Sequence, residues 1–175
     1  MNEERHSKVV DDFVHLVRQY LTLIDVLPGP NAKDFLSNCA IVLPQIYSLA
    51  HQLPDVELPD DDPLEGSIGI ESPIGRIIRA LGKYDLYYEV FDPVTEKDAI
   101  PHSLSNDLAD IYLDLMRPLL KHDSGDEANQ RLAIWEWKFH LQIHWGHHLV
   151  DALRPIHRLI YEHLGSDTES QKRGI

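Results

Sequence analysis

The sequence predicts an all-α protein, a helical bundle of about five helices with a long C-terminal helix that can bend. Three observations predict this fold class. Apolar residues recur at three- and four-residue steps through most of the chain, which is the period of an amphipathic helix. No segment shows the alternation typical of a half-buried strand, and the chain contains no internal repeat. At 175 residues it is long enough to bury a core, so we expect a single helical domain over residues 1–175.

Two helices and a loop are predicted in the first part of the chain. A wide apolar stripe forms the first helix over residues 9–24. The second helix covers residues 32–51, and Pro44 should kink or divide it because proline removes a helical hydrogen bond. Residues 53–72 hold three prolines, two glycines and a concentrated negative charge, which indicates an acidic loop.

The middle of the chain predicts two more helices. The third covers residues 73–90, with Pro73 in the first turn, where proline is favoured. The fourth begins near Ser103 or Ser105, since either serine can cap a helix N-terminus. Asp107 follows in the first turn, where a carboxylate suits the helix dipole.

The last helical pattern is long and contains two residues that favour a bend. It covers residues 127–164, and an unbroken helix of that length would extend roughly 57 Å at 1.5 Å per residue. Gly146 and Pro155 are the natural positions for a bend. Residues 166–175 are expected to form a flexible tail.

Composition restricts the class of partner. The formal charge is −13, from 16 basic and 29 acidic residues, so binding to nucleic acid or to an anionic membrane is disfavoured. A divalent metal, a small polar ligand or a basic protein partner is compatible with this charge, and self-association as a homo-oligomer stays open. Cys39 is the only cysteine, which excludes an intrachain disulfide and a cysteine zinc site. With no signal peptide or membrane-spanning run in the sequence, we expect a cytoplasmic location.

The strongest candidate site lies in residues 135–157, which hold all three tryptophans and five of the eleven histidines. At about 100° per residue, one stripe of this helix contains five ionisable side chains, flanked by apolar residues on both sides. Such a stripe is predicted to point inward, and buried ionisable groups are costly unless they are paired, hydrogen-bonded or metal-bound. The stripe consists of Glu136, His140, His144, His147 and Asp151.

The fourth helix carries a second polar stripe, which can face the first one. It consists of Asp107, Asp110 and Asp114, at three- and four-residue steps. Together the two stripes offer nitrogen and oxygen ligands that suit Zn, Mn or Fe. An aspartate stripe is also typical of a solvated helix face, and this is the interpretation that the sequence favours slightly. The histidines outside the pattern are predicted to be surface residues: His15, His51, His102 and His122.

Three blocks of the chain carry a resemblance to a known family. The segments "LGKYDLYYEVFDP", "SLSNDLADIYLDL" and "WEWKFHLQIHWGHHLVDALRPIH" resemble, in that order, a bacterial family known only as a domain of unknown function. The resemblance covers roughly residues 81–157 and brings no established activity or cofactor. Its C-terminal element implies His148 beside Asp151 and Arg154, whereas the helical wheel favours His147, so both histidines remain candidate ligands. The matching positions are Asp107, Asp110, Ile111, Tyr112, Trp145, Gly146, His148, Asp151, Ala152, Leu153 and Arg154.

Two hypotheses follow from the sequence. In the first, the polar site binds a divalent metal or a small polar ligand, and Trp137, Trp145 and Arg154 beside it contact that ligand. If the site is catalytic, metal-activated water is the natural chemistry. In the second, the protein is an acidic adaptor or inhibitor and the polar stripe is a purely structural network. The motifs of zinc proteases, di-iron bundles, phosphate-binding loops and serine hydrolases are absent, so whether the protein is an enzyme stays open.

Overall fold

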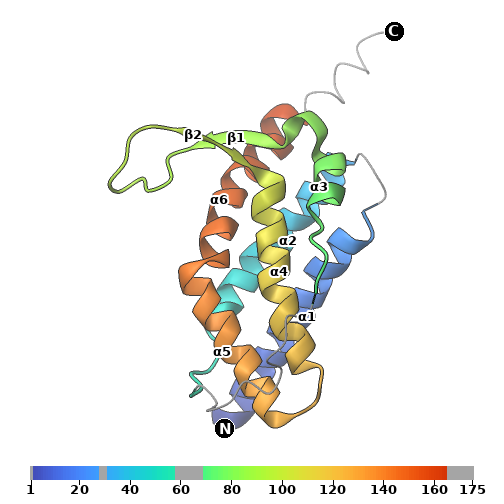
Figure 1. Ribbon diagram of the computed structural model, residues 1–175, viewed down its shortest axis with the longest axis vertical. Coiled ribbons are helices and arrows are strands. Elements are labelled where there is room, and N and C mark those ends of the chain that lie inside the picture. The colour runs from blue at the N-terminus through green and yellow to red at the C-terminus, as the bar shows by residue number, and fades with distance from the viewer. Residues whose placement is uncertain (1, 28–30, 58–68, 165–175) are drawn as a thin grey trace.

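The computed structural model describes residues 2–27, 31–57 and 69–164 (Figure 1). It is mostly helical, which confirms the predicted fold class. A two-stranded antiparallel hairpin and two short helical segments accompany the long helices. Six α-helices lie within the described residues: α1 (Asn2–Asp25), α2 (Ala32–Ala50), α3 (Ile74–Leu81), α4 (Leu104–His122), α5 (Glu127–Ile143) and α6 (Trp145–Arg158). The other elements are the 3-10 helix η1 (Gly82–Tyr84), the strands β1 (Leu86–Glu89) and β2 (Ile100–Ser103), and the π-helical turn η2 (Leu159–His163).

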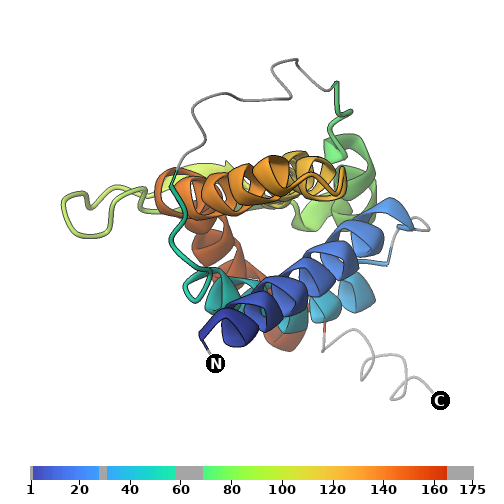
Figure 2. The ribbon, with the colours of Figure 1, turned by 90° about the horizontal axis from the view of Figure 1, so that it is seen from below.

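Helix α4 occupies the centre of the bundle. It packs against α5 and α6 on one side and against α3 and α1 on the others. Helices α1 and α2 pair with each other, and α2 also contacts α6, so α6 lies between α2 and α4. Seen along the bundle, α4 with α5 and α1 with α2 form two layers (Figure 2). This arrangement brings the N-terminal half of α4 alongside α6.

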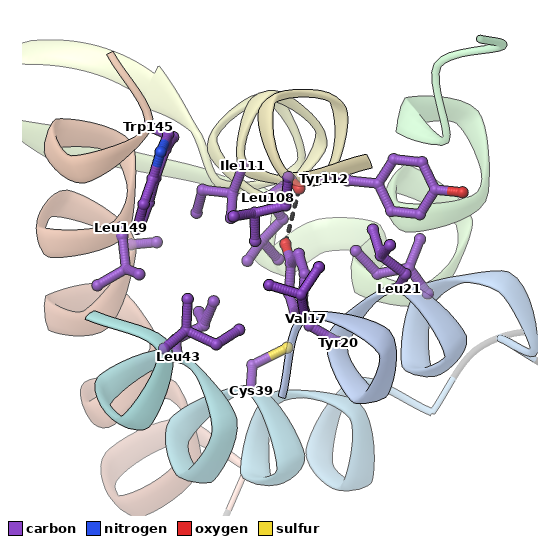
Figure 3. Packing of buried hydrophobic residues seen from close by; sticks show 14 of the residues in the cluster. Val17, Tyr20, Leu21, Cys39, Leu43, Leu108, Ile111, Tyr112, Trp145 and Leu149 are labelled. Atoms are coloured by element: carbon purple, nitrogen blue, oxygen red, sulfur yellow. Dashed lines mark hydrogen bonds between the residues drawn. The ribbon is translucent and has the colours of Figure 1, made fainter. Parts of the chain in front are cut away.

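The core lies between these two layers (Figure 3). Side chains of α1, α2, α4 and α6 meet there, among them Val17, Leu43, Leu108 and Leu149, all fully or almost fully buried. The Tyr20 hydroxyl in this core is satisfied, because it donates to the backbone oxygen of Leu108 at 2.7 Å (Figure 3). The apolar stripes that predicted the helices are therefore the surfaces on which they pack.

The prediction of one helix over residues 73–90 is wrong. Helix α3 ends at Gly82, whose φ of 55° lies in the left-handed region that glycine adopts most readily. The chain continues through η1 into β1, which pairs with β2 from Leu86 opposite Ser103 to Glu89 opposite Ile100. The loop of this hairpin projects beyond α6 in Figure 1.

The long C-terminal helix is also not continuous. It breaks at His144, whose φ of −146° and ψ of −86° are not helical, two residues before the expected bend at Gly146. The cause is a close approach: a Cβ on Gly146 would lie 2.0 Å from the Leu141 carbonyl oxygen. Pro155 lies within α6, and Pro44 lies within α2 without dividing it. The residues that the structure describes therefore form six α-helices, where the sequence predicted about five.

Other predictions fall partly outside the described residues. Ser103 is the N-cap of α4, and its side chain accepts a hydrogen bond from the backbone N–H of Asn106, as predicted. Of the predicted acidic loop, residues 54–57 and 69–72 form neither helix nor strand, and residues 58–68 lie outside the described part of the chain. The predicted tail, 166–175, lies outside it as well. None of the helices in the described segments combines the length and the apolar character needed to cross a membrane.

Candidate metal centre

The polar faces of α4 and of α5–α6 lie against each other. Asp107 and Asp114 on α4 are buried, with 1% and 5% of their surface exposed, and Asp110 between them is partly exposed. The slightly favoured interpretation of this stripe as a solvated helix face is therefore wrong. Buried carboxylates need partners. The histidines of the facing helices provide them.

The first pair joins Asp107 and His148. His148 Nδ1 lies 2.9 Å from Asp107 Oδ1, and the Tyr87 hydroxyl donates to Asp107 Oδ2 at 2.7 Å. The hydrogen bond to Asp107 raises the pKa of His148, although burial opposes it, and the charges of Asp107, Asp110 and Asp151 act in the same direction. Burial, followed by the hydrogen bond to Asp107 and the charge of Asp107, holds the pKa of Tyr87 far above its ordinary value. Both oxygens of the buried Asp107 carboxylate therefore have a hydrogen-bond partner.

The second pair joins Asp114 and His144. His144 Nδ1 lies 2.6 Å from Asp114 Oδ2, and His140 Nδ1 lies 4.0 Å from the same oxygen. The rings of His144 and His148 meet edge to face with centroids 4.8 Å apart. Each of these two rings thus has its Nδ1 directed at a buried aspartate.

The other ring nitrogen of His148 lies near Asp110. His148 Nε2 is 3.5 Å from Asp110 Oδ2, and that oxygen also accepts a hydrogen bond from Asn106 Nδ2 at 2.8 Å. One ligand atom from each of Asp110, His144 and His148 lies within 4.8 Å of the other two. Among the His, Cys, Asp and Glu side chains of the described residues, these three lie close enough together to hold a metal ion.

These histidines line a cleft of about 940 Å³ at the junction of α5 and α6. The end of α2, the loop of the hairpin, and β2 form its other walls. His147 and Asp151 line it too, so two further members of the predicted stripe lie beside the centre. The remaining residues of the wall are Tyr47, His51, Phe91, Asp92, Pro93, His102, Leu141, Gln142, Ile143, Gly146 and Val150.

A carboxylate cluster behind the cleft was not predicted from the sequence. Glu89 on β1 has 8% of its surface exposed, and His102 Nδ1 on β2 lies 3.0 Å from its Oε1, outside hydrogen-bond geometry. Burial raises the pKa of Glu89, and the charge of Asp151 adds to this. Burial, followed by the charge of Asp107, likewise raises the pKa of Asp151. His51 and His102, predicted to be simple surface residues, both line the cleft.

Four predicted residues lie away from this cluster. Glu136 accepts a hydrogen bond from Lys121 Nζ at 2.7 Å, in a partly buried ion pair. Trp137 and Trp145 are fully buried, and their indole N–H groups donate to the backbone oxygens of Leu115 and Trp137 respectively. Arg154 is exposed and is not part of the cleft wall. The structure therefore does not bring these side chains together with the histidines.

The polar stripe is less enclosed than the helical wheel predicts. One of its apolar flanks faces solvent, since Phe139, Ile143 and Val150 are 40%, 56% and 50% exposed. The reason is that α4 covers only one side of α5 and α6. The site is therefore the wall of an open cleft and not a closed internal chamber.

Comparisons with known proteins give a family and a fold. A family model described as a domain of unknown function, DUF5063, matches residues 4–162. The fold is similar to the crystal structure of protein BF1032 from Bacteroides fragilis, with a TM-score of 0.77, 23% sequence identity, and coverage of 89% of this chain and 94% of that one. At this identity the likeness concerns the fold alone. A comparison with curated proteins finds no match.

Proposed function

Because the chain belongs to the DUF5063 family, a domain of unknown function, we propose its function from the site itself: it binds one divalent metal ion through Asp110, His144 and His148. One observation carries the proposal. Both histidines direct Nδ1 at a buried aspartate, His148 Nε2 lies 3.5 Å from Asp110 Oδ2, and a ring nitrogen of His144 lies within 4.8 Å of the ligand atoms of both.

This arrangement is the one that metal-binding histidines use in proteins. Such a histidine nearly always donates its other ring N–H to a carboxylate or carbonyl, which fixes the ring and leaves the ligating nitrogen unprotonated. Asp107 and Asp114 are the supporting carboxylates here, and Tyr87 in turn orients Asp107. A network that served only to join helices would not require a ring nitrogen of each histidine to lie within 4.8 Å of a third ligand atom, on Asp110.

The donor set restricts the metal and the type of centre. Two imidazoles and a carboxylate suit Zn, Mn or Fe(II), and the sequence predicted the same three metals. Three protein ligands leave coordination positions open to water or to a substrate atom, as in catalytic and not structural centres. Because His144 and His148 line the cleft, those positions are accessible to a small molecule.

Protons compete with the metal for His148. When this ring is protonated, it bridges Asp107 and Asp110 through its two nitrogens, and this is why its pKa is raised. A metal ion binds only the unprotonated ring. Metal affinity should therefore increase as the pH rises through the pKa of His148.

Metal titration of protein without a histidine tag tests the proposal. We expect one Zn or Co(II) ion per chain by calorimetry at pH 7.5, and a loss of affinity of at least about tenfold in His148→Asn and in Asp110→Asn. The matched control is His15→Asn, which removes an exposed imidazole from α1, a helix outside the cleft wall, and should leave the affinity unchanged. Circular dichroism checks that each variant is folded. Absence of binding, or equal affinity in the wild type and both site variants, would show that the aspartates and histidines form only a structural network.

We further propose that the protein acts in the cytoplasm as a single helical domain, without nucleic acid as a partner. The net charge of −13 supports the second part, since phosphate backbones attract basic surfaces. The single cysteine, Cys39, is buried and free, which suits a reducing compartment.

A further inference from the structure

We propose that the cleft beside the metal centre binds a small organic cation, an amine whose ammonium group pairs with Asp151 and whose hydrocarbon part lies against the apolar walls. This ligand site goes beyond the proposed metal function and does not depend on it. The residues proposed to contact the amine differ from the metal ligands, because Asp151, Tyr47 and Phe91 are not among those three.

The size of the cleft fits a small molecule. Its volume of about 940 Å³ lies near the upper end of the range of roughly 300–1,000 Å³ that ligand sites occupy. Four separate parts of the chain build it: the end of α2, the hairpin, the end of α5 and the start of α6. A site formed by several elements can contact a ligand from more than one direction.

The walls are mainly apolar. Ile143 and Val150 on one side are each at least half exposed, and Phe91 on the hairpin is 69% exposed. A hydrocarbon ligand would cover these side chains and remove their surface from water. Tyr47 and Phe91 also offer aromatic faces, which attract ammonium groups.

The charge of the cleft selects a cation. No lysine or arginine lies in the described wall, whereas two carboxylates do, Asp92 and Asp151. The Asp92 carboxylate is already engaged, because it accepts hydrogen bonds from the Val94 N–H at 2.9 Å and the Thr95 hydroxyl at 2.6 Å. Asp151 is the wall carboxylate that remains for a ligand.

The surroundings of Asp151 leave its negative charge poorly compensated. Burial is the main cause that raises the pKa of Asp151 and of Glu89. The charge of Asp107 adds to it for Asp151, and the charges of Asp151 and Asp107 add to it for Glu89. Glu89 Oε1 is buried and has no hydrogen-bond donor among the described residues. His102, His147 and His148 offset this charge only while they are protonated. A bound ammonium group would stabilise the ionised Asp151 at a pH at which ordinary histidines are neutral.

A divalent ion at the neighbouring centre does not reverse this preference. Five carboxylates besides Asp92 lie at or behind the cleft and exceed the two positive charges of such an ion. Anionic ligands, such as phosphate esters and fatty acids, are therefore disfavoured even in the metal-bound protein. The five are Glu89, Asp107, Asp110, Asp114 and Asp151.

Three probes of equal chain length test the proposal: hexylammonium, hexanol and hexanoate, titrated by ligand-observed NMR at pH 8. We expect hexylammonium to bind at least tenfold more tightly than hexanoate, both in protein dialysed against EDTA and in protein with zinc. In Asp151→Asn, hexylammonium affinity should fall about tenfold, to that of hexanol. Asp11→Asn removes the same charge from an exposed position on α1, which does not line the cleft, and should bind like the wild type.

The outcomes separate this inference from the metal proposal. Tighter binding of hexanoate, no binding of any probe, or an unchanged hexylammonium affinity in Asp151→Asn would overturn the inference, provided that thermal unfolding shows the variant to be folded. Zinc binding is measured on the same samples. If zinc does not bind but hexylammonium is preferred and this preference is lost in Asp151→Asn, only the metal proposal fails. If zinc binds but hexylammonium is not preferred, only the cation site is refuted.

Discussion

Replacing Gly146 by alanine should destabilise the protein, because the added methyl group has no room. Gly146 is the second residue of α6, directly after the break at His144. An alanine Cβ there would lie 2.0 Å from the Leu141 carbonyl oxygen and 3.1 Å from both its carbonyl carbon and its Cδ1. Non-bonded contacts of this kind are essentially never shorter than 3.0 Å, so α5 and α6 would have to move apart by about 1 Å.

The size of the effect follows from two opposing contributions. Overpacking costs about 1–3 kcal/mol, and the upper end applies because the obstructing atom belongs to the backbone and cannot rotate away. Alanine regains up to about 1 kcal/mol in helix propensity over glycine. The net loss is about 2 kcal/mol, which for a chain of this size lowers the melting temperature by about 4–8 °C. Zinc affinity should fall as well, since His144 and His148 lie on opposite sides of the displaced junction.

Gly75→Ala is the matched control for this prediction. Gly75 also lies at the second position of a helix, α3, but the nearest atom to its added Cβ is Arg79 Nη1 at 3.7 Å, an ordinary contact. This variant should be as stable as the wild type or gain up to about 1 kcal/mol. Urea unfolding and thermal melts, both followed by circular dichroism, measure the two variants. If Gly146→Ala melts at or above the wild-type temperature while Gly75→Ala behaves as expected, close packing does not cause the helix break.

Two further predictions concern pH and use metal-free protein. The pKa of His148 is raised in the folded state, so its pairing with Asp107 stabilises the protein fully below the unfolded value near 6.5, and this stability is lost as the pH rises through the folded pKa. In Asp107→Asn, NMR titration should give a lower His148 pKa and the unfolding free energy should change less over this pH range; an unchanged pKa would contradict the assigned hydrogen bond. The pKa of Glu89 is also raised, so ionised Glu89 destabilises the folded state once the pH exceeds its folded pKa. Glu89→Gln should therefore increase the unfolding free energy at pH 8 more than at pH 4. If the variant has a lower unfolding free energy than the wild type at pH 8, the ionised Glu89 stabilises the fold through its contact with His102.

The parts of the fold that depend on local sequence could be predicted. Apolar periodicity located the helical segments because the same stripes form the packed core. The cap at Ser103 followed from residue type and position alone. The juxtaposition of the α4 aspartates with the histidines was one of two interpretations of the stripe, and periodicity could not decide between a solvated face and a buried one.

The hairpin escaped prediction because its inward face is polar. Its alternation places Tyr87 and Glu89 inward and leaves Leu86 and Tyr88 exposed, so a search for alternating apolar residues finds no half-buried strand. Gly82 was the available signal, because a glycine after a helical segment often marks its end. The burial of Glu89 behind the cleft depends on how the hairpin packs on the helices, which is tertiary information.

The roles of individual stripe residues also depended on packing. Glu136 shares the helical face of His140, but Lys121 lies opposite it near the end of α4, and the two form an ion pair. Trp137 and Trp145 flank the stripe in sequence and fill the core in space, with their N–H groups bound to backbone oxygens. A helical wheel gives the direction of a side chain but not the group that faces it, and the facing group decides the role.

The helix break explains how the centre is assembled. Asp107 and Asp114 are seven residues apart on α4, which is about 10.5 Å along its axis, whereas four residues of helix separate His148 from His144 by only about 6 Å. A continuous helix would leave one histidine short of its aspartate. Because His144 is the non-helical residue between α5 and α6, its ring can reach Asp114 while His148 reaches Asp107. One ring nitrogen of each histidine then lies within 4.8 Å of an oxygen of Asp110, which is about midway between the two aspartates along α4. The absence of a side chain at Gly146 permits this break, so the residue that interrupts the helix also makes the three-ligand geometry attainable.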